Sequence, residues 1–125
     1  VRETLGLDYV AKIPYVEKNK TNNPGLLVNG SFIKADFKHS FHNIRIKMEQ
    51  DHRKNKNSVY MITSTVPNEG KTMVSINTAI TLGQKGYKVC LVDLDMRNPS
   101  VEKTMRYANI HRTSLDFIKD EDVNL

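Results

Sequence analysis

An apolar segment that leads directly into Gly70, Lys71 and Thr72 is the feature that most constrains the fold of this chain. The segment reads Tyr60-Met-Ile-Thr-Ser-Thr-Val-Pro-Asn-Glu-Gly-Lys-Thr72. Its last three residues match the end of the pattern G-x-x-x-x-G-K-[ST], in which Thr65 takes the place of the first glycine. Backbone N–H groups at a helix N-terminus bind phosphate, and the helix dipole favours its negative charge. The pattern therefore predicts a phosphate-binding loop between a strand and a helix.

The residue types in this loop suit a nucleotide. Gly70 lets the backbone approach the phosphates, the Lys71 ammonium would reach the β- and γ-phosphates, and the Thr72 hydroxyl would bind Mg²⁺. The residues expected to contact the nucleotide are Val66, Pro67, Asn68, Glu69, Gly70, Lys71, Thr72 and Met73.

The residues on either side of the loop predict a strand–helix–strand unit. We expect residues 59–63 to form a first strand, residues 71–85 a helix that Gly86 ends, and residues 88–94 a second strand. Such a unit places two parallel strands in one sheet, with a right-handed crossover. Because the second strand is continuously apolar, we expect it to be buried on both faces, together with Cys90.

Two acidic residues stand at the carboxyl end of the second strand. Asp93 and Asp95 stand two residues apart, so they share one face of an extended segment, and Arg97 comes next. The carboxyl ends of the strands form the ligand-binding edge of an open α/β sheet. Carboxylate and hydroxyl oxygens are ligands that Mg²⁺ prefers. We therefore expect a metal site made by Thr72, Asp93 and Asp95, with Arg97 close to the developing phosphoryl charge.

Upstream of this unit the sequence predicts a further helix. Apolar residues recur at helical spacing from Phe32 to Met48, which indicates a helix over about 32–51 that Ser31 can cap. Residues 51–57 are strongly basic and are expected to form a solvated loop. Shorter helices are expected over residues 101–107 and 114–120.

Composition limits the compartment and the partners. The 125 residues carry a net charge of +5, which suits an anionic ligand, a membrane surface or nucleic acid. Aromatic residues are not interleaved with the basic run, so we expect no nucleic acid partner. The one cysteine allows no disulfide within the chain and fits a reducing compartment. No apolar run approaches the roughly 20 residues that a membrane-spanning helix needs.

Both motifs resemble those of the bacterial tyrosine kinases. Thr63–Thr72 resembles their Walker A segment, commonly S-S-x-P-G-E-G-K-[ST], in which the first glycine is also missing. Asn68 departs from that pattern because glycine is usual there, although asparagine tolerates a positive φ better than most residues. Leu91–Ser100 looks like the Walker A′ motif of these kinases, in which apolar residues precede D-x-D-x-R and often x-P-[ST].

The resemblance extends to the N-terminal part of the chain. Glu3–Pro14 looks like the cytoplasmic segment that follows the last membrane helix of fused kinases or of their separate membrane adaptor. It implies a juxtamembrane segment and linker over residues 1–30, and a P-loop kinase domain over residues 31–125 that lacks its C-terminal part. It also implies a location at the cytoplasmic face of the membrane, with the membrane adaptor or the chain's own upstream membrane helices as the partner.

A self-association helix is also part of the resemblance. Phe37–Ile44 is similar to the helix in which these kinases carry the motif E-x-x-R-x-x-R. Ala35, Lys38 and Phe41 stand at its three charged positions, so only one position keeps its charge. The resemblance implies a homo-oligomer, through a degenerate association motif.

The resemblance implies an α/β fold, a parallel P-loop NTPase sheet flanked by helices, of which this chain supplies the N-terminal part. It implies a transferase that binds ATP or ADP with Mg²⁺, phosphorylates itself on tyrosine, and regulates the polymerisation and export of capsular polysaccharide or exopolysaccharide. The catalytic residues would be Lys71, Asp93, Asp95 and Arg97, and either aspartate could be the general base.

Two other functions fit parts of the sequence. ATPase switches of the septum-placement or plasmid-partition type carry K-G-G-x-G-K-[ST], with a lysine at the position of Val66, which disfavours them here. A non-catalytic nucleotide-binding or interaction module of a polysaccharide chain-length regulator is the other alternative. Asn68, the altered association helix and the lack of a Walker B pattern after residue 97 all favour this module.

Overall fold

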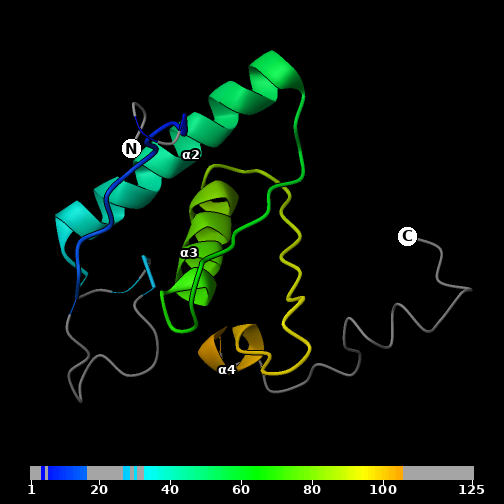
Figure 1. The fold of residues 1–125 in the computed structure, drawn as a ribbon. Helices are drawn as coiled ribbons and strands as arrows, with labels where there is room; N and C mark the ends of the chain where they lie inside the picture. Colours follow the sequence, from blue (N-terminus) through cyan, green and yellow to red (C-terminus); the bar gives the residue numbers. More distant parts are fainter. Residues whose placement is uncertain (1–3, 5, 17–26, 29, 31–32, 106–125) are drawn as a thin grey trace, which may run out of the picture.

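The computed structural model describes residues 4, 6–16, 27–28, 30 and 33–105. Over these residues the chain forms three helices: α2 Ala35–Asn55, α3 Lys71–Gln84 and α4 Val101–Met105 (Figure 1). The helix expected over residues 114–120, and the last two residues of the one expected over 101–107, lie outside the described residues. Figure 1 shows α3 beside α2, and α4 beside the end of α3 at which the phosphate-binding loop lies.

The long helix α2 confirms the predicted helix but lies further along the chain. It begins at Ala35 after Lys34, which makes no side-chain capping bond, and Ser31 is outside the described residues. It continues to Asn55, so most of residues 51–57, which were expected to form a loop, belong to the end of the helix. Basic side chains near a helix C-terminus interact favourably with the helix dipole. The helix ends where Lys56 adopts φ 61° and its N–H donates to the His52 carbonyl oxygen.

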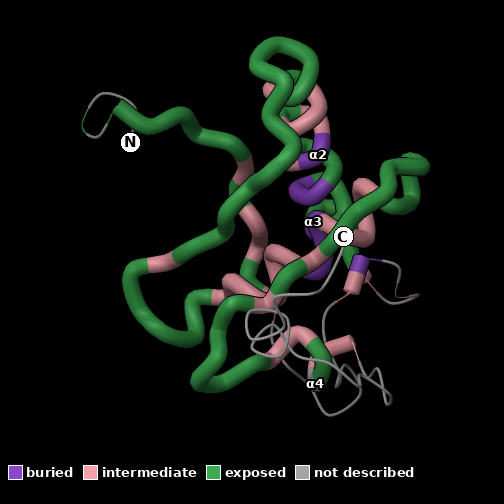
Figure 2. Tube along the Cα trace, turned by 90° about the vertical axis from the view of Figure 1, so that its right-hand side faces the viewer, coloured by how far each residue is buried: buried purple, intermediate pink, exposed green. Residues whose placement is uncertain are grey.

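The hydrophobic core lies between α2 and α3. Phe37, Phe41 and Ile76 are at most 1% exposed, and Val28 packs with the two phenylalanines. Figure 2 shows the buried residues gathered along the two long helices. Part of the N-terminal segment covers α2, because Ile13 and Val16 contact this core. The spacing of the apolar residues in α2 therefore predicted the buried face of the helix.

The predicted sheet is not observed in the described residues. Residues 59–63 and 88–94 adopt no strand there and make no backbone hydrogen bonds with each other. The prediction of a buried second strand is wrong for this structure, because Val92 is 58% exposed and Cys90 is exposed as well. Parallel strands occur almost only in sheets whose two faces are covered, and two strands alone offer little stability. The described residues supply no further strands, and residues 59–63 and most of residues 88–94 are exposed.

The segment before the loop is held to α2 by a side chain. The Tyr60 hydroxyl lies 3.1 Å from each of three acceptors, the Met48 carbonyl and an Asp51 carboxylate oxygen in α2 and the Asn57 carbonyl just after it. This contact fixes the start of the segment that leads to the phosphate-binding loop. None of the helices in the described part of the chain is long and apolar enough to cross a membrane.

Candidate nucleotide-binding site

The phosphate-binding loop, residues 65–72, leads into α3 through a glycine that the backbone geometry requires. Gly70 is the N-cap of α3 and has φ 95°, a conformation that side chains with a Cβ rarely adopt. Its carbonyl accepts the first helical bond, from the Val74 N–H at 2.9 Å. Asn68 has φ 65°, as its tolerance for positive φ led us to expect. Two residues with positive φ, Asn68 and Gly70, thus turn the chain from the apolar segment into α3.

A carboxylate closes the first part of this loop. Glu69 accepts hydrogen bonds from the backbone N–H of Thr65 at 3.1 Å and of Val66 at 3.3 Å. The Val66 N–H and the Ser64 side chain, with the Thr65 N–H and hydroxyl, lower the pKa of the Glu69 carboxyl below its ordinary value. The side chain therefore fixes the start of the loop, while the amides from Asn68 onward belong to the turn and helix start that would receive phosphate.

The loop lysine is held against the segment that precedes it. The Lys71 ammonium donates to the Ser64 hydroxyl at 2.9 Å, and Ser64 in turn donates to the Val66 carbonyl at 2.9 Å. The side chain is partly buried and folds back over the loop. The ammonium is therefore held at the start of the loop, beside Ser64.

The predicted aspartates form a compact turn before α4. Asp93 Oδ1 accepts the Asp95 N–H at 3.0 Å, and Asp95 Oδ1 accepts the Asn98 N–H at 3.1 Å. Asp93 Oδ2 also accepts the N–H groups of Ser100 at 3.0 Å and Val101 at 3.1 Å, at the start of α4. Asp93 therefore folds the chain back on itself and fixes the N-terminal end of the short helix.

One hydrogen bond joins this turn to the phosphate-binding loop. The hydroxyl oxygens of Thr72 and Ser100 lie 2.7 Å apart, and both residues are partly buried. The Ser100 hydroxyl contacts Thr72, and the Ser100 N–H donates to Asp93. Ser100 therefore connects Thr72 to Asp93. The two motifs, 28 residues apart in sequence, therefore meet without a sheet in the described residues.

The predicted site residues are thus partly assembled. Thr72 and Asp93 are linked through Ser100, Lys71 lies over the start of the loop, and Asp95 stabilises its own turn. Arg97 lies in the same turn and is exposed. Sequence reasoning gave no role to Ser64 or to Ser100, although both stand inside the quoted motifs. The presence of a serine hydroxyl inside each motif could have indicated that Ser64 and Ser100 take part in the site.

The oxygen atoms at this junction fit a magnesium ion in their chemistry. A threonine hydroxyl and a carboxylate are hard ligands, and Mg²⁺ usually takes one or two protein carboxylates and completes its shell with phosphates and water. The described residues contain no group of three or more His, Cys, Asp or Glu side chains placed to hold a metal. Thr72 and Asp93 could therefore supply part of a magnesium shell, with phosphate oxygens and water as its remaining ligands.

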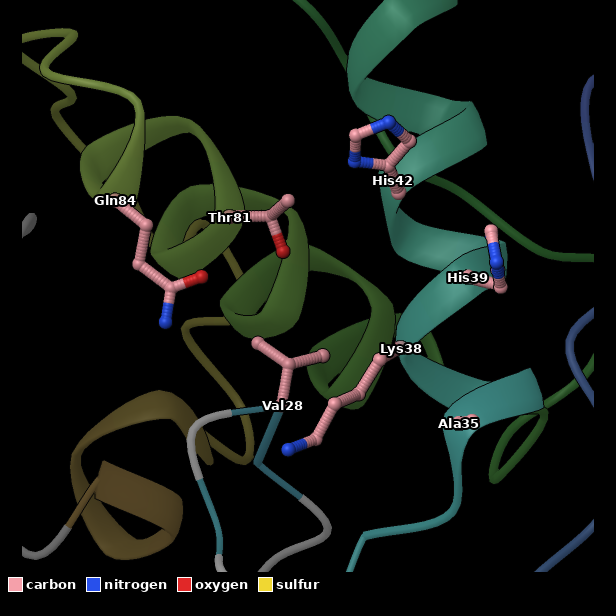
Figure 3. A pocket seen from close by; sticks show the side chains of 7 residues that line it. All are labelled: Val28, Ala35, Lys38, His39, His42, Thr81 and Gln84. Carbon is pink, nitrogen blue, oxygen red and sulfur yellow. The ribbon is translucent and has the colours of Figure 1, made fainter.

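A groove of about 380 Å³ lies between α2 and α3, away from the phosphate-binding loop (Figure 3). The residues that line it are Val28, Ala35, Lys38, His39, His42, Thr81 and Gln84. Thr81 and Gln84 belong to the C-terminal half of α3, while the loop precedes its first residue. The groove is therefore separate from the candidate nucleotide site.

Three curated relatives carry names that bear on function. The chain is 49% identical to the tyrosine-protein kinase YwqD of Bacillus subtilis over 41 residues, which are 33% of this chain and 17% of the relative. It is 49% identical to the tyrosine-protein kinase CpsD of Streptococcus pneumoniae over 43 residues, 34% of this chain and 19% of the relative. It is 29% identical to the succinoglycan biosynthesis transport protein ExoP of Rhizobium meliloti over 68 residues, 54% of this chain and 9% of the relative.

The chain spans less than a third of the length of the curated relatives it matches first. No solved structure matches it. A family model described as ParA, NUBPL iron-transfer P-loop NTPase, matches residues 55–120, which include the phosphate-binding loop, α3 and the aspartate turn. Because this match covers more than half of the residues, the chain belongs to the ParA family of P-loop NTPases.

Proposed function

We propose that this chain is the ATP-binding part of a bacterial tyrosine autokinase that regulates the polymerisation and export of a capsular polysaccharide or exopolysaccharide. The observation that carries the proposal is the 2.7 Å contact between the Thr72 and Ser100 hydroxyls, which joins the phosphate-binding loop to the Asp93 turn. The names of the relatives, two tyrosine-protein kinases and a succinoglycan biosynthesis transport protein, support the same reading.

In this proposal the loop binds the phosphates and the turn supplies the acidic groups. The backbone amides from Asn68 to Met73 and the Lys71 ammonium would hold the phosphates of ATP. Thr72 and Asp93, with Asp95 beside them, would hold the Mg²⁺ ion, which neutralises charge on the phosphoryl group. One of the two aspartates would accept the proton of the tyrosine hydroxyl, and Arg97 would stabilise charge on the transferred group.

The proposal includes a place and partners for the chain. The N-terminal segment that packs on α2 would connect the domain to a membrane adaptor or to membrane helices of the same protein, at the cytoplasmic face. Self-association would have to use exposed residues, such as Ala35 and Lys38 on α2. Phe41, the third position of the association motif, is fully buried against the core and is not on that surface.

Phosphotyrosine formation tests the proposal directly. The chain is incubated with Mg²⁺ and ATP and probed for phosphotyrosine, together with Lys71→Met, Asp93→Asn and the control Lys85→Met. Lys85 is exposed at the far end of α3, so its substitution repeats the loss of one lysine outside the site. We expect signal in the wild-type chain and in the control, and none in the other two variants. Equal signal in Lys71→Met would contradict the proposal.

The same geometry would also serve a nucleotide-binding module without phosphotransfer. Glu69 and Ser64 hold the loop by contacts that need no reaction, so the loop is shaped for binding in either case. ATP binding that depends on Lys71, without phosphotyrosine, would favour this module. Release of phosphate without phosphotyrosine would instead favour an ATPase switch.

A further inference from the structure

Among the residues that the structure describes, the Thr72 hydroxyl pairs with the hydroxyl of Ser100, a residue without a role in the proposed chemistry. The two hydroxyl oxygens of Thr72 and Ser100 lie 2.7 Å apart, and either can donate. A hydroxyl that binds a cation does so through an oxygen lone pair, so its hydrogen must point to an acceptor elsewhere. With a metal at Thr72, the donor in this pair is therefore Thr72.

We propose that Ser100 is a positioning residue for the metal site of the proposed nucleotide-binding function. Its oxygen accepts the Thr72 hydrogen and so turns a Thr72 lone pair toward Mg²⁺. Partners that orient metal ligands in this way commonly contribute roughly 10- to 100-fold to metal affinity. The inference rests on the proposed function, because it assigns Ser100 to the same site.

The backbone of Ser100 is fixed from two directions, as this role requires. Its N–H donates to Asp93 Oδ2 at 3.0 Å. Its carbonyl accepts the Thr104 N–H at 3.0 Å and the Thr104 hydroxyl at 2.7 Å. The Ser100 hydroxyl is thus presented to Thr72 by a turn and a helix start that do not depend on the loop itself.

This arrangement gives Asp93 a second effect on the metal. Besides its own carboxylate oxygens, Asp93 sets the position of the residue that orients Thr72. Two of the three expected metal ligands, Thr72 and Asp93, are therefore both hydrogen-bonded to Ser100. A serine that only stabilised α4 would affect nucleotide binding equally with and without Mg²⁺, which separates the two roles experimentally.

The test measures ATP affinity by calorimetry in Mg²⁺ and again in excess EDTA, and takes the ratio as the gain due to the metal. The variants are Ser100→Ala, Ser100→Thr and the control Ser75→Ala. Ser75 is a partly buried serine one turn into α3, and its hydroxyl donates to the Lys71 carbonyl at 2.9 Å. We expect Ser100→Ala to lower the metal-dependent gain roughly tenfold. Its affinity in EDTA should not change, and Ser100→Thr and Ser75→Ala should keep the full gain.

Each other result overturns the inference. A full gain in Ser100→Ala removes the role of Ser100 and leaves the proposed function standing. Equal weakening in Mg²⁺ and EDTA, or a loss in Ser100→Thr as large as in Ser100→Ala, shows a structural role only. No ATP binding by the wild-type chain in either condition refutes the proposed function and this inference with it. Ser100→Cys, which keeps the volume but is a weak acceptor, replaces the alanine variant if that variant does not fold.

Discussion

Asn77 Oδ1 accepts a hydrogen bond from the backbone N–H of Val28 at 2.7 Å, across 49 residues of sequence. Asn77 is fully buried, and its Nδ2 donates to the Met73 carbonyl at 2.9 Å. A single amide in the middle of α3 therefore satisfies a buried backbone group that precedes α2. This contact ties the helix after the phosphate-binding loop to the N-terminal part of the chain.

Replacing Asn77 should be costly for this reason. Asn77→Ala leaves the buried Val28 N–H without its acceptor, and an unsatisfied buried group of this kind costs about 1–3 kcal/mol. Urea denaturation followed by circular dichroism measures the change in the free energy of unfolding. Asn43→Ala, on an exposed position of α2, is the matched control and should change it by less than about 0.5 kcal/mol. A loss in Asn77→Ala as small as in the control would show that the buried contact is not formed in solution.

The buried position of Phe41 gives a second prediction. An arginine at this position would restore a charge of the association motif, but it would place that charge in the core between α2 and α3. We expect Phe41→Arg to lower the free energy of unfolding by roughly 3 kcal/mol or more, through the lost packing and the buried charge. Ala35→Glu also restores a motif charge, at an exposed position, and should be tolerated. Thermal unfolding compares the two, and a stable, oligomeric Phe41→Arg protein would contradict the structure.

The helices and the loop could be predicted because their signals are local. Apolar spacing indicated the face that contains Phe37 and Phe41, and Gly70 marked the start of α3. The preference of asparagine for positive φ at Asn68 is also a property of one residue. By contrast, the end of α2 was missed, because basic residues that favour a solvated loop also suit the C-terminal turn of a helix.

The sheet and the Ser100 contact depend on residues far away in sequence. An apolar run such as 88–94 predicts a buried strand only if partner strands and covering helices pack against it. The described residues contain no partner strand, and most of residues 88–94 are exposed. The prediction that Cys90 is buried is wrong for the same reason, because Cys90 is exposed. The bond from Thr72 to Ser100 depends on how the Asp93 turn reverses the chain, which the spacing of the motif alone does not state.

Glu69 predicts a pH-dependent loop. Hydrogen bonds, first from the Val66 N–H, hold the pKa of this carboxyl below its ordinary value of 4.5. A group whose pKa is lowered by folding contributes stability that is complete above the ordinary value and is lost as the pH falls through the lower folded pKa. The Glu69 carboxylate should therefore contribute fully to the stability of the loop above pH 4.5, and this contribution should be lost as the pH falls below it.

The amide resonances of Thr65 and Val66 report this loss. In an NMR titration both should shift together with the Glu69 carboxyl, at a midpoint below 4.5. Glu69→Gln keeps an acceptor oxygen but cannot titrate, so the two resonances should show no such transition in that variant. A midpoint at or above 4.5, or the same transition in Glu69→Gln, would mean that the carboxylate does not hold the loop.

The last prediction concerns two residues other than glycine that have positive φ. Lys56 ends α2 with φ 61°, and Asn68 turns the phosphate-binding loop with φ 65°. This conformation costs most residues about 1–2 kcal/mol but costs glycine almost nothing and asparagine less than most. Lys56→Gly should therefore raise the free energy of unfolding by about 0.5–1 kcal/mol, once the greater freedom of glycine in the unfolded chain is subtracted. Asn68→Ala should lower it by about 1 kcal/mol, and Asn68→Gly should leave it nearly unchanged.

Urea denaturation measures all three, with Lys54→Gly as the control. Because Lys54 lies in the last turn of α2, glycine there should lower the free energy of unfolding by up to about 1 kcal/mol, the opposite sign to the change two residues further on. If both lysine variants lose stability equally, the helix does not end at Lys56 in solution.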